Sequence, residues 1–208
     1  AVLEKESVFG QTFSCKGEEF AISLAGVYQK ENAVLALNAL EELDRLGWTT
    51  TMEQRKDGLL HTSWKGRFTV INKKPLFIVD GAHNAGAADK MAESIRHYFK
   101  AYLSDKPVIL VMGVFADKEY KIVLEKTAHF AEKIYTIETP DNPRALPAEE
   151  LAKAARVYNS SAESTKSIKD AVEKAFSCAG DDENSVILAF GSLSFIGALT
   201  NAVEEYVG

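Results

Sequence analysis

An aspartate and a histidine follow a short apolar run in the segment FIVDGAHN, residues 77–84. The carboxylate of Asp80 can accept hydrogen bonds, and the imidazole of His83 can both donate and accept them. Gly81 and Gly86 allow a tight loop, and amides at the start of a following helix favour an anion. The segment therefore predicts a polar site at a strand end. Taken alone, a plain strand-to-helix turn capped by Asp80 is an equally good interpretation.

Four further polar residues lie where a ligand could be met. Ser192 follows the apolar run SVILAF and can donate to a carboxylate or a phosphate, and Arg67 stands in WKGRF, before the first strand of that region. Asn32 falls in the first turn of an expected helix, and Asp117 in the loop after VMGVFA. Taken singly, a turn, a solvated arginine and a helix cap are the simpler interpretations of Ser192, Arg67 and Asn32.

Apolar runs alternate with helical patterns from Lys74 onward, and this alternation would position these residues. Nearly continuous apolar strands separated by helices predict an α/β fold with a doubly wound, mostly parallel sheet covered on both faces. Ligands of such sheets lie beyond the carboxyl ends of the strands, where Asp80, His83 and Ser192 fall. Strands are expected at 75–80, 107–113, 134–138 and 185–191, and helices at 88–103, 119–133, 148–158, 167–180 and 198–208.

Residues 1–63 follow a different pattern. Residues 11–26 predict a hairpin around Lys16 and Gly17, and alanines and leucines at 3–4 spacing predict a helix from Gln29 to Gly47. A hairpin and helices alone cannot close a sheet. We therefore expect residues 1–63 to be the tail of a domain that begins upstream, and residues 64–208 to be a complete α/β domain.

Composition excludes several classes of function. The chain of 208 residues has 46% hydrophobic and 26% charged residues, with a net charge of −6 and no block of Lys or Arg, which argues against nucleic acid as a partner. No apolar run approaches the roughly 20 residues of a membrane helix. The two cysteines, Cys15 and Cys178, are far apart, which suits a reducing, cytoplasmic location and argues against a zinc site.

Two common phosphate-binding motifs are absent from the sequence. Gly81 and Gly86 have the glycine spacing of a P-loop, but Ala87 and Ala88 stand in place of its Lys and Ser/Thr. No G-x-G-x-x-G segment follows any expected strand, which argues against a dinucleotide site. A nucleotide would therefore meet this chain as an accessory surface.

Five segments in order resemble the folylpolyglutamate synthase/dihydrofolate synthase family, within the Mur-ligase-like group of ATP-dependent amide ligases. The segments are GVYQKENAVLAL, WKGRF, FIVDGAHN, VMGVFADKEY and FGSLSFIG. The family's P-loop belongs to an N-terminal and central ATPase portion. The resemblance therefore implies that this chain holds the end of the central domain (1–63) and the C-terminal glutamate-ligase domain (64–208).

The resemblance also implies roles for five residues. Asn32 would bind the adenine of ATP, Arg67 its phosphates, and Asp80 the hydroxyls of its ribose. His83 would lie near the transferred phosphate or the incoming glutamate and so take part in catalysis, and Ser192 would help to hold that glutamate. No metal ligand is expected in this chain, because the family's Mg²⁺ ligands belong to the absent portion.

The implied reaction joins L-glutamate to folate or dihydropteroate. ATP would convert a substrate carboxylate to an acyl phosphate, which the glutamate amine then attacks. We expect this chain to be inactive alone, and the full-length protein to be a cytoplasmic monomer that does not bind membranes. Two alternatives remain open: a stand-alone nucleotide- or amino-acid-binding module without catalysis, and a Mur-type peptidoglycan ligase.

Overall fold

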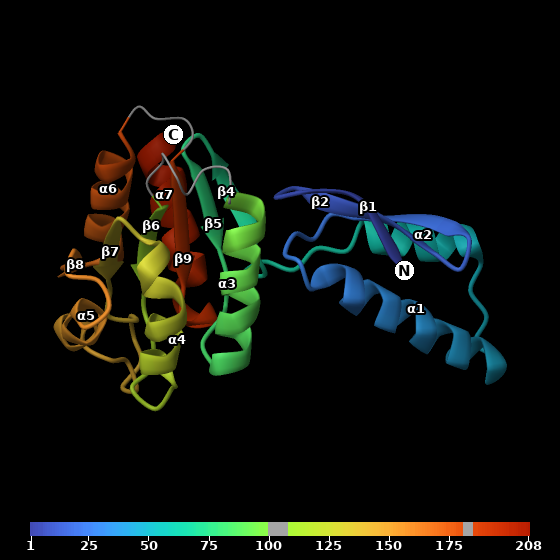
Figure 1. Ribbon diagram of the computed structural model, residues 1–208, viewed down its shortest axis with the longest axis horizontal. Coiled ribbons are helices and arrows are strands. Elements are labelled where there is room, and N and C mark those ends of the chain that lie inside the picture. Colours follow the sequence, from blue (N-terminus) through green and yellow to red (C-terminus); the bar gives the residue numbers. More distant parts are fainter. Residues whose placement is uncertain (100–107, 181–184) are drawn as a thin grey trace. The chain divides into compact units, whose positions relative to one another are not determined.

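The computed structural model divides the chain into two compact units, Ala1–Arg67 and Phe68–Gly208 (Figure 1). It describes residues 1–99, 108–180 and 185–208. The end of the expected helix 88–103 and the first residue of the expected strand 107–113 lie outside these ranges. The boundary between the units falls a few residues after the joint that the sequence predicts. Each unit is described by itself below.

Unit 1 combines a small antiparallel sheet with two helices. The expected hairpin is present, with Lys16 (φ 52°) and Gly17 (φ 85°) in its turn, and a further strand pairs with its first strand. The expected helix begins at Gln29 and ends at Arg45. The first strand and the second helix were not predicted. The elements are β1 (Val2–Ser7), β2 (Gly10–Cys15), β3 (Glu18–Ile22), α1 (Gln29–Arg45) and α2 (Met52–Leu60).

The core of unit 1 is small, and α1 has apolar side chains on two faces. Phe13, Phe20 and Leu37 are among the buried residues of this core. On the other face of α1, Leu35 is 69% exposed, and Leu46, which follows the last residue of the helix, is 76% exposed. A helix that is apolar on opposite faces is typical of one buried between two layers. Unit 1 by itself therefore leaves apolar surface uncovered.

Unit 2 alternates strands and helices, as expected. Its elements are β4 (Thr69–Lys73), β5 (Leu76–Val79), α3 (Ala85–Phe99), β6 (Val108–Met112), α4 (Tyr120–Thr127), η1 (Ala128–Phe130), β7 (Lys133–Thr136), α5 (Ala148–Arg156), β8 (Ala162–Ser164), α6 (Ile168–Ala179), β9 (Val186–Phe190), η2 (Leu193–Phe195) and α7 (Ile196–Val207).

The six-stranded sheet of unit 2 has the order β4-β5-β9-β6-β7-β8. The strands from β5 to β8 in this order are parallel, and β4 pairs antiparallel with β5. The last strand of the sequence, β9, lies between β5 and β6. The predicted mostly parallel α/β sheet is confirmed. The edge strands β4 and β8 were missed, because they are short and only partly buried and so lack a continuous apolar run.

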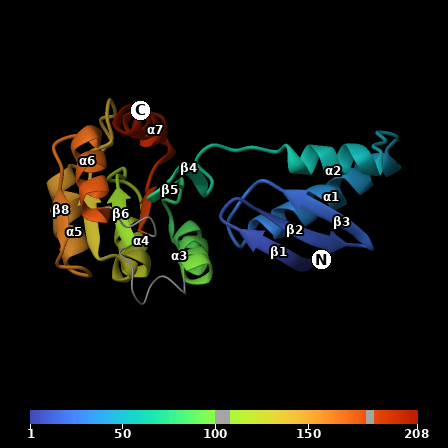
Figure 2. The same cartoon turned by 90° about the horizontal axis from the view of Figure 1, so that it is seen from above.

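Helices cover both faces of this sheet, as Figure 2 shows for α3 and α4 on one side and α7 on the other. Buried side chains of alternate strand positions, such as Val111 and Ile187, form one cluster with the helices α6 and α7. The positions between them, such as Leu110 and Leu188, are also buried and point to the opposite face. Burial on both faces explains why these strands read as unbroken apolar runs.

A buried tyrosine makes the stability of unit 2 sensitive to high pH. Burial raises the pKa of Tyr135 to about 12, and the neighbouring Cys178 adds to this shift. Because the folded-state pKa lies above the usual value near 10, the stabilisation is fully present below pH 10 and is lost as the pH rises towards 12. We expect the free energy of unfolding to fall over this interval more steeply in the native chain than in Tyr135→Phe. Equal slopes in denaturant titrations of the two proteins would contradict this.

Candidate functional site

The carboxyl ends of β5, β9 and β6 meet at one edge of the sheet. The amide of Asp80 donates to the carbonyl of Ala189 (2.9 Å), and the amide of Gly113 donates to that of Phe190 (3.2 Å). The loops that follow three neighbouring strands therefore start side by side. Asp80 and Ser192, more than a hundred residues apart in the sequence, come to the same edge.

Two glycines allow the loops after β9 and β6 to approach closely. Gly191 has a φ of +117°, and a Cβ at this position would lie 2.3 Å from the carbonyl oxygen of Gly113. A Cβ on Gly113 would in turn lie 2.7 Å from the side chain of Ile137. No side chain fits at either glycine without a shift of its neighbours, so the close approach of the two loops requires glycine at both positions.

Asp80 is a buried carboxylate that accepts hydrogen bonds from two backbone amides. Its side chain accepts from the amide of Phe68 at Oδ2 (2.8 Å) and from the amide of Ala82 at Oδ1 (2.7 Å). The residue is 4% exposed. An ionised carboxylate can only accept, and here each of its two oxygens accepts from a backbone amide. The carboxylate is fixed in place by the loops that it joins.

His83 is half-buried and has a defined tautomer. Its Nδ1 lies 2.7 Å from the carbonyl oxygen of Gly81. A carbonyl oxygen can only accept, so this contact assigns a proton to Nδ1 and leaves Nε2 as the acceptor of the neutral ring. Nε2 is therefore the atom through which this imidazole can take up or release a proton.

The N-terminus of α3 is capped by the asparagine that ends the segment DGAHN. Asn84 accepts at Oδ1 from the amide of Ala87 (2.9 Å). The carboxylate of Glu119 accepts from the amide of Ala85 (3.2 Å). The sequence predicts that an anion binds at this helix end, and in the structure the carboxylate of Glu119 occupies part of that position. Neither Asn84 nor Glu119 was predicted, although asparagine before a helix is an N-cap signal.

Loss of this cap is expected to destabilise unit 2 moderately. Asn84→Ala leaves the amide of Ala87 without its acceptor, and it should cost about 1 kcal/mol in the free energy of unfolding. Asn84→Asp is the matched control, because aspartate also caps and its charge suits the positive end of the helix dipole. Denaturant titration of the three proteins measures the difference. Equal stabilities of the alanine and aspartate variants would refute the capping role.

Ser192 begins the turn that leads into α7. Its Oγ accepts from the amide of Ser194 (3.2 Å) and lies 2.7 Å from the Ser194 Oγ. Ser192 is 6% exposed, whereas Leu193 beside it is 45% exposed. Ser192 therefore caps the short η2 helix, the structural role that the sequence favours for this serine in isolation.

The loops after β6 and β7 are joined through an arginine that the sequence did not single out. Arg144 donates to the carboxylate of Asp117 through Nε (3.2 Å) and Nη2 (2.6 Å), and its guanidinium lies 4.9 Å from the centre of the Phe115 ring. The carbonyl of Arg144 accepts from the amide of Ala116 (2.8 Å). The guanidinium holds the pKa of Asp117 below its usual value. Asp117 thus serves to connect the two loops.

Asn32 and Arg67 belong to unit 1. Asn32 is exposed in the first turn of α1 and donates through Nδ2 to the side-chain oxygen of Gln29 (2.9 Å). Arg67 is half-buried and ends unit 1, between Gly66 (φ 83°) and Phe68 (φ 46°). The structure therefore brings Asp80, His83 and Ser192 to one sheet edge of unit 2, whereas Asn32 and Arg67 both lie in unit 1.

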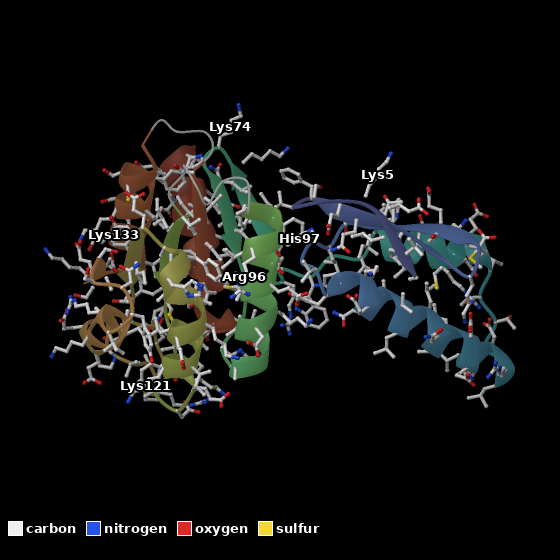
Figure 3. All side chains as sticks on the ribbon, viewed as in Figure 1. Lys5, Lys74, Arg96, His97, Lys121 and Lys133 are labelled. Carbon is white, nitrogen blue, oxygen red and sulfur yellow. The ribbon has the colours of Figure 1, made fainter. Side chains whose placement is uncertain are left out.

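Other ionisable side chains of unit 2 pack against aromatic rings. Figure 3 labels Arg96 and His97 on α3. Arg96 lies over the ring of Phe130 (5.1 Å), and His97 meets Tyr98 edge-on (5.2 Å).

Within residues 1–99, 108–180 and 185–208, no group of three His, Cys, Asp or Glu side chains could hold a metal ion. In the same ranges, no helix is long and apolar enough to cross a membrane.

The fold and the edge site define an α/β domain that presents a carboxylate, an imidazole and a hydroxyl at the carboxyl ends of parallel strands. Residues 66–193, more than half of the chain, match the family described as Mur ligase, glutamate ligase domain. The chain belongs to this family.

Several relatives carry folate-enzyme names. The chain is 29% identical over 201 residues to the dihydrofolate synthase/folylpolyglutamate synthase of Bacillus subtilis, covering 94% of this chain and 45% of that protein. It is 27% identical over 145 residues to the folylpolyglutamate synthase of Lacticaseibacillus casei, covering 67% and 33%. A folylpolyglutamate synthase from Mycobacterium tuberculosis, solved with ADP, superimposes with a TM-score of 0.79 at 25% identity over 95% of this chain and 46% of the other. The chain spans less than half the length of these relatives.

Proposed function

We propose that this chain is the C-terminal part of an ATP-dependent ligase that adds L-glutamate to folate or dihydropteroate. The observation that carries the proposal is the joining of Asp80, His83 and Ser192 at one sheet edge in a glutamate ligase domain. The names of the relatives support folate-type substrates, and the ADP in the mycobacterial enzyme supports a nucleotide. The reaction would pass through an acyl phosphate that the glutamate amine attacks. A cytoplasmic location and a monomeric full-length protein remain predictions.

Each site residue has a proposed role that suits its chemistry. Asn32 binds adenine, because an amide both donates and accepts, and Arg67 binds the phosphates through its fork of donors. Asp80 accepts from the ribose hydroxyls, because a carboxylate is an acceptor of hydroxyl hydrogen bonds. His83 acts at the transferred phosphate or the incoming glutamate through Nε2. Ser192 helps to hold that glutamate by its hydroxyl.

Unit 1 is proposed to be the end of the central ATPase domain. The exposed leucines on α1 support this, because a complete domain seldom leaves a helix apolar on a second face. The match covers 45% of the Bacillus subtilis relative, so that protein has further residues that could form the remainder of such a domain. Mg²⁺ is expected in the ligase, but the residues described here offer no cluster that fits it. No step is therefore assigned to the metal in this chain.

The decisive experiment is an assay of the complete protein that contains this chain. ADP release should require ATP, L-glutamate and either dihydropteroate or a folate, and the product should carry one more glutamate. If the protein binds nucleotide or glutamate but forms no amide bond, the stand-alone binding module replaces this proposal. If it accepts a nucleotide-linked peptide and rejects both pterins, the Mur-type ligase replaces it.

His83→Ala should impair catalysis without a matching loss of stability. We expect kcat, or kcat/KM for glutamate, to fall by about 10²-fold, the usual contribution of a positioned proton-transfer group. The matched control is His97→Ala on α3, which leaves the sheet edge intact and should retain wild-type kinetics. Wild-type kinetics in the His83 variant would return this residue to a structural role in the loop.

A further inference from the structure

The two units are linked through a segment whose backbone is unusual at two positions. Gly66 has a φ of 83° and Phe68 a φ of 46°, and Arg67 lies between them. A bulky residue rarely adopts a positive φ, because its Cβ crowds the backbone. Such a conformation persists where the surroundings hold it in place. The contacts of Phe68 are therefore informative.

Phe68 is held at both its side chain and its amide. Phe68 is 2% exposed, and its ring lies against those of Tyr98 (centroids 5.6 Å apart) and Phe99 (6.5 Å) of α3. The amide donates to Oδ2 of Asp80 (2.8 Å). The antiparallel pairing of β4 with β5 sets Thr69 opposite Val79, which brings Phe68 opposite Asp80.

The acceptor of this hydrogen bond is itself held by further hydrogen bonds. The backbone amide of Asp80 is bonded to Ala189 in the neighbouring strand β9, and its Oδ1 is bonded to the amide of Ala82. Asp80 is also buried, so water does not compete freely for its carboxylate. The charge of Asp80 strengthens both bonds to the amides. Together these contacts form a clamp, made by the Asp80 carboxylate on the amide of Phe68, that fixes the backbone at the first residue of unit 2.

We propose that Asp80 is a positioning residue for Arg67, acting through its clamp on the amide of Phe68. The clamp holds the residue after Arg67 in one backbone conformation, so that the guanidinium is presented to the ATP phosphates in a single orientation. This inference rests on the proposed function, because it assumes that Arg67 binds phosphate. It assigns the buried carboxylate a role that is separate from any contact with the ribose.

Amide hydrogen exchange in the 208-residue chain tests the clamp without any activity. In Asp80→Asn the charge is lost and one carboxylate oxygen is replaced by an NH₂ group, which cannot accept. We expect the Phe68 amide to exchange at least about tenfold faster, while the Ala87 amide, held by Asn84, keeps its rate. Asp89→Asn, an exposed carboxylate on α3, is the matched control. An unchanged Phe68 rate, or equal acceleration at Ala87, would overturn the clamp.

A double-mutant cycle in the complete ligase tests the positioning of Arg67. Asp80→Asn should lower kcat/KM for ATP about tenfold in the wild-type background, and less than twofold in an Arg67→Ala background, because the residue to be positioned is then absent. A merely structural role of Asp80, or a direct ribose contact alone, predicts the same loss in both backgrounds, and this result would overturn the proposal.

Two further measurements distinguish a failure of this inference from a failure of the proposed function. With 2′-deoxy-ATP and 3′-deoxy-ATP as substrates, the loss caused by Asp80→Asn should persist if it acts through Arg67, and its disappearance with either analogue would overturn the positioning role. If the unmodified ligase shows no ATP-dependent amide formation, the proposed function fails and the phosphate role of Arg67 fails with it. Faster Phe68 exchange in Asp80→Asn would still establish the clamp in that case.

Discussion

Gly191→Ala is expected to destabilise unit 2 by about 3 kcal/mol, through strain at a φ of +117° and overlap of the new Cβ with the backbone of Gly113. The new methyl group would lie 2.3 Å from a carbonyl oxygen, so the loops after β9 and β6 must move apart. A loss of this size should lower the melting temperature by on the order of 10 °C. Differential scanning calorimetry of the variant and the native chain measures it.

Gly197→Ala is the matched control for this substitution. Gly197 lies in the first turn of α7, and a Cβ there meets nothing within 4 Å. Because alanine favours a helix over glycine, the control should be neutral or stabilised by up to about 1 kcal/mol. If Gly191→Ala has the same melting temperature as the control, the close approach of the two loops does not limit which residue fits at position 191. In the complete ligase, Gly191→Ala should also impair glutamate use, because Ser192 follows directly.

Asp80→Ala is expected to have the other large effect, because it leaves two buried amides without their acceptor. Phe68 and Ala82 are each 2% exposed, and an unsatisfied buried donor costs about 1–3 kcal/mol. The free energy of unfolding should therefore fall by roughly 4 kcal/mol. In the complete ligase the same change should raise the apparent KM for ATP about tenfold or more, since a hydrogen bond to a charged group contributes about 1.5–3 kcal/mol.

The two consequences of Asp80→Ala are separable by experiment. Denaturant unfolding of the 208-residue chain reports the structural part, and ATP kinetics below the melting temperature of the variant report the binding part. Asp117→Ala is the control, because its carboxylate is exposed and paired with Arg144, and the loss of such a pair should change stability little. An unchanged KM for ATP would remove Asp80 from the nucleotide site, and an unchanged stability would show that its amide bonds are dispensable.

The pattern of residue types was enough to predict the fold class and to place three candidate site residues at strand ends. Apolar runs with no polar alternation revealed the buried parallel strands, because both faces of such strands meet helices. A strand end followed by Asp80, and another followed by Ser192, placed these residues at a carboxyl edge before their neighbours were known. The order of five short segments identified the family to which residues 66–193 belong.

Which strand ends meet, and what each polar group contacts, is visible only in the folded chain. The insertion of β9 between β5 and β6 joins Asp80 to the Ser192 loop, and the antiparallel β4 sets the amide of Phe68 on Asp80. The pairing of Arg144 with Asp117 likewise joins two loops that follow different strands. Periodicity reports which face of a strand or helix is buried, but it carries no information about its neighbour in space. Those neighbours are selected by packing and hydrogen bonding across long sequence separations, which appear only when the whole sheet has formed.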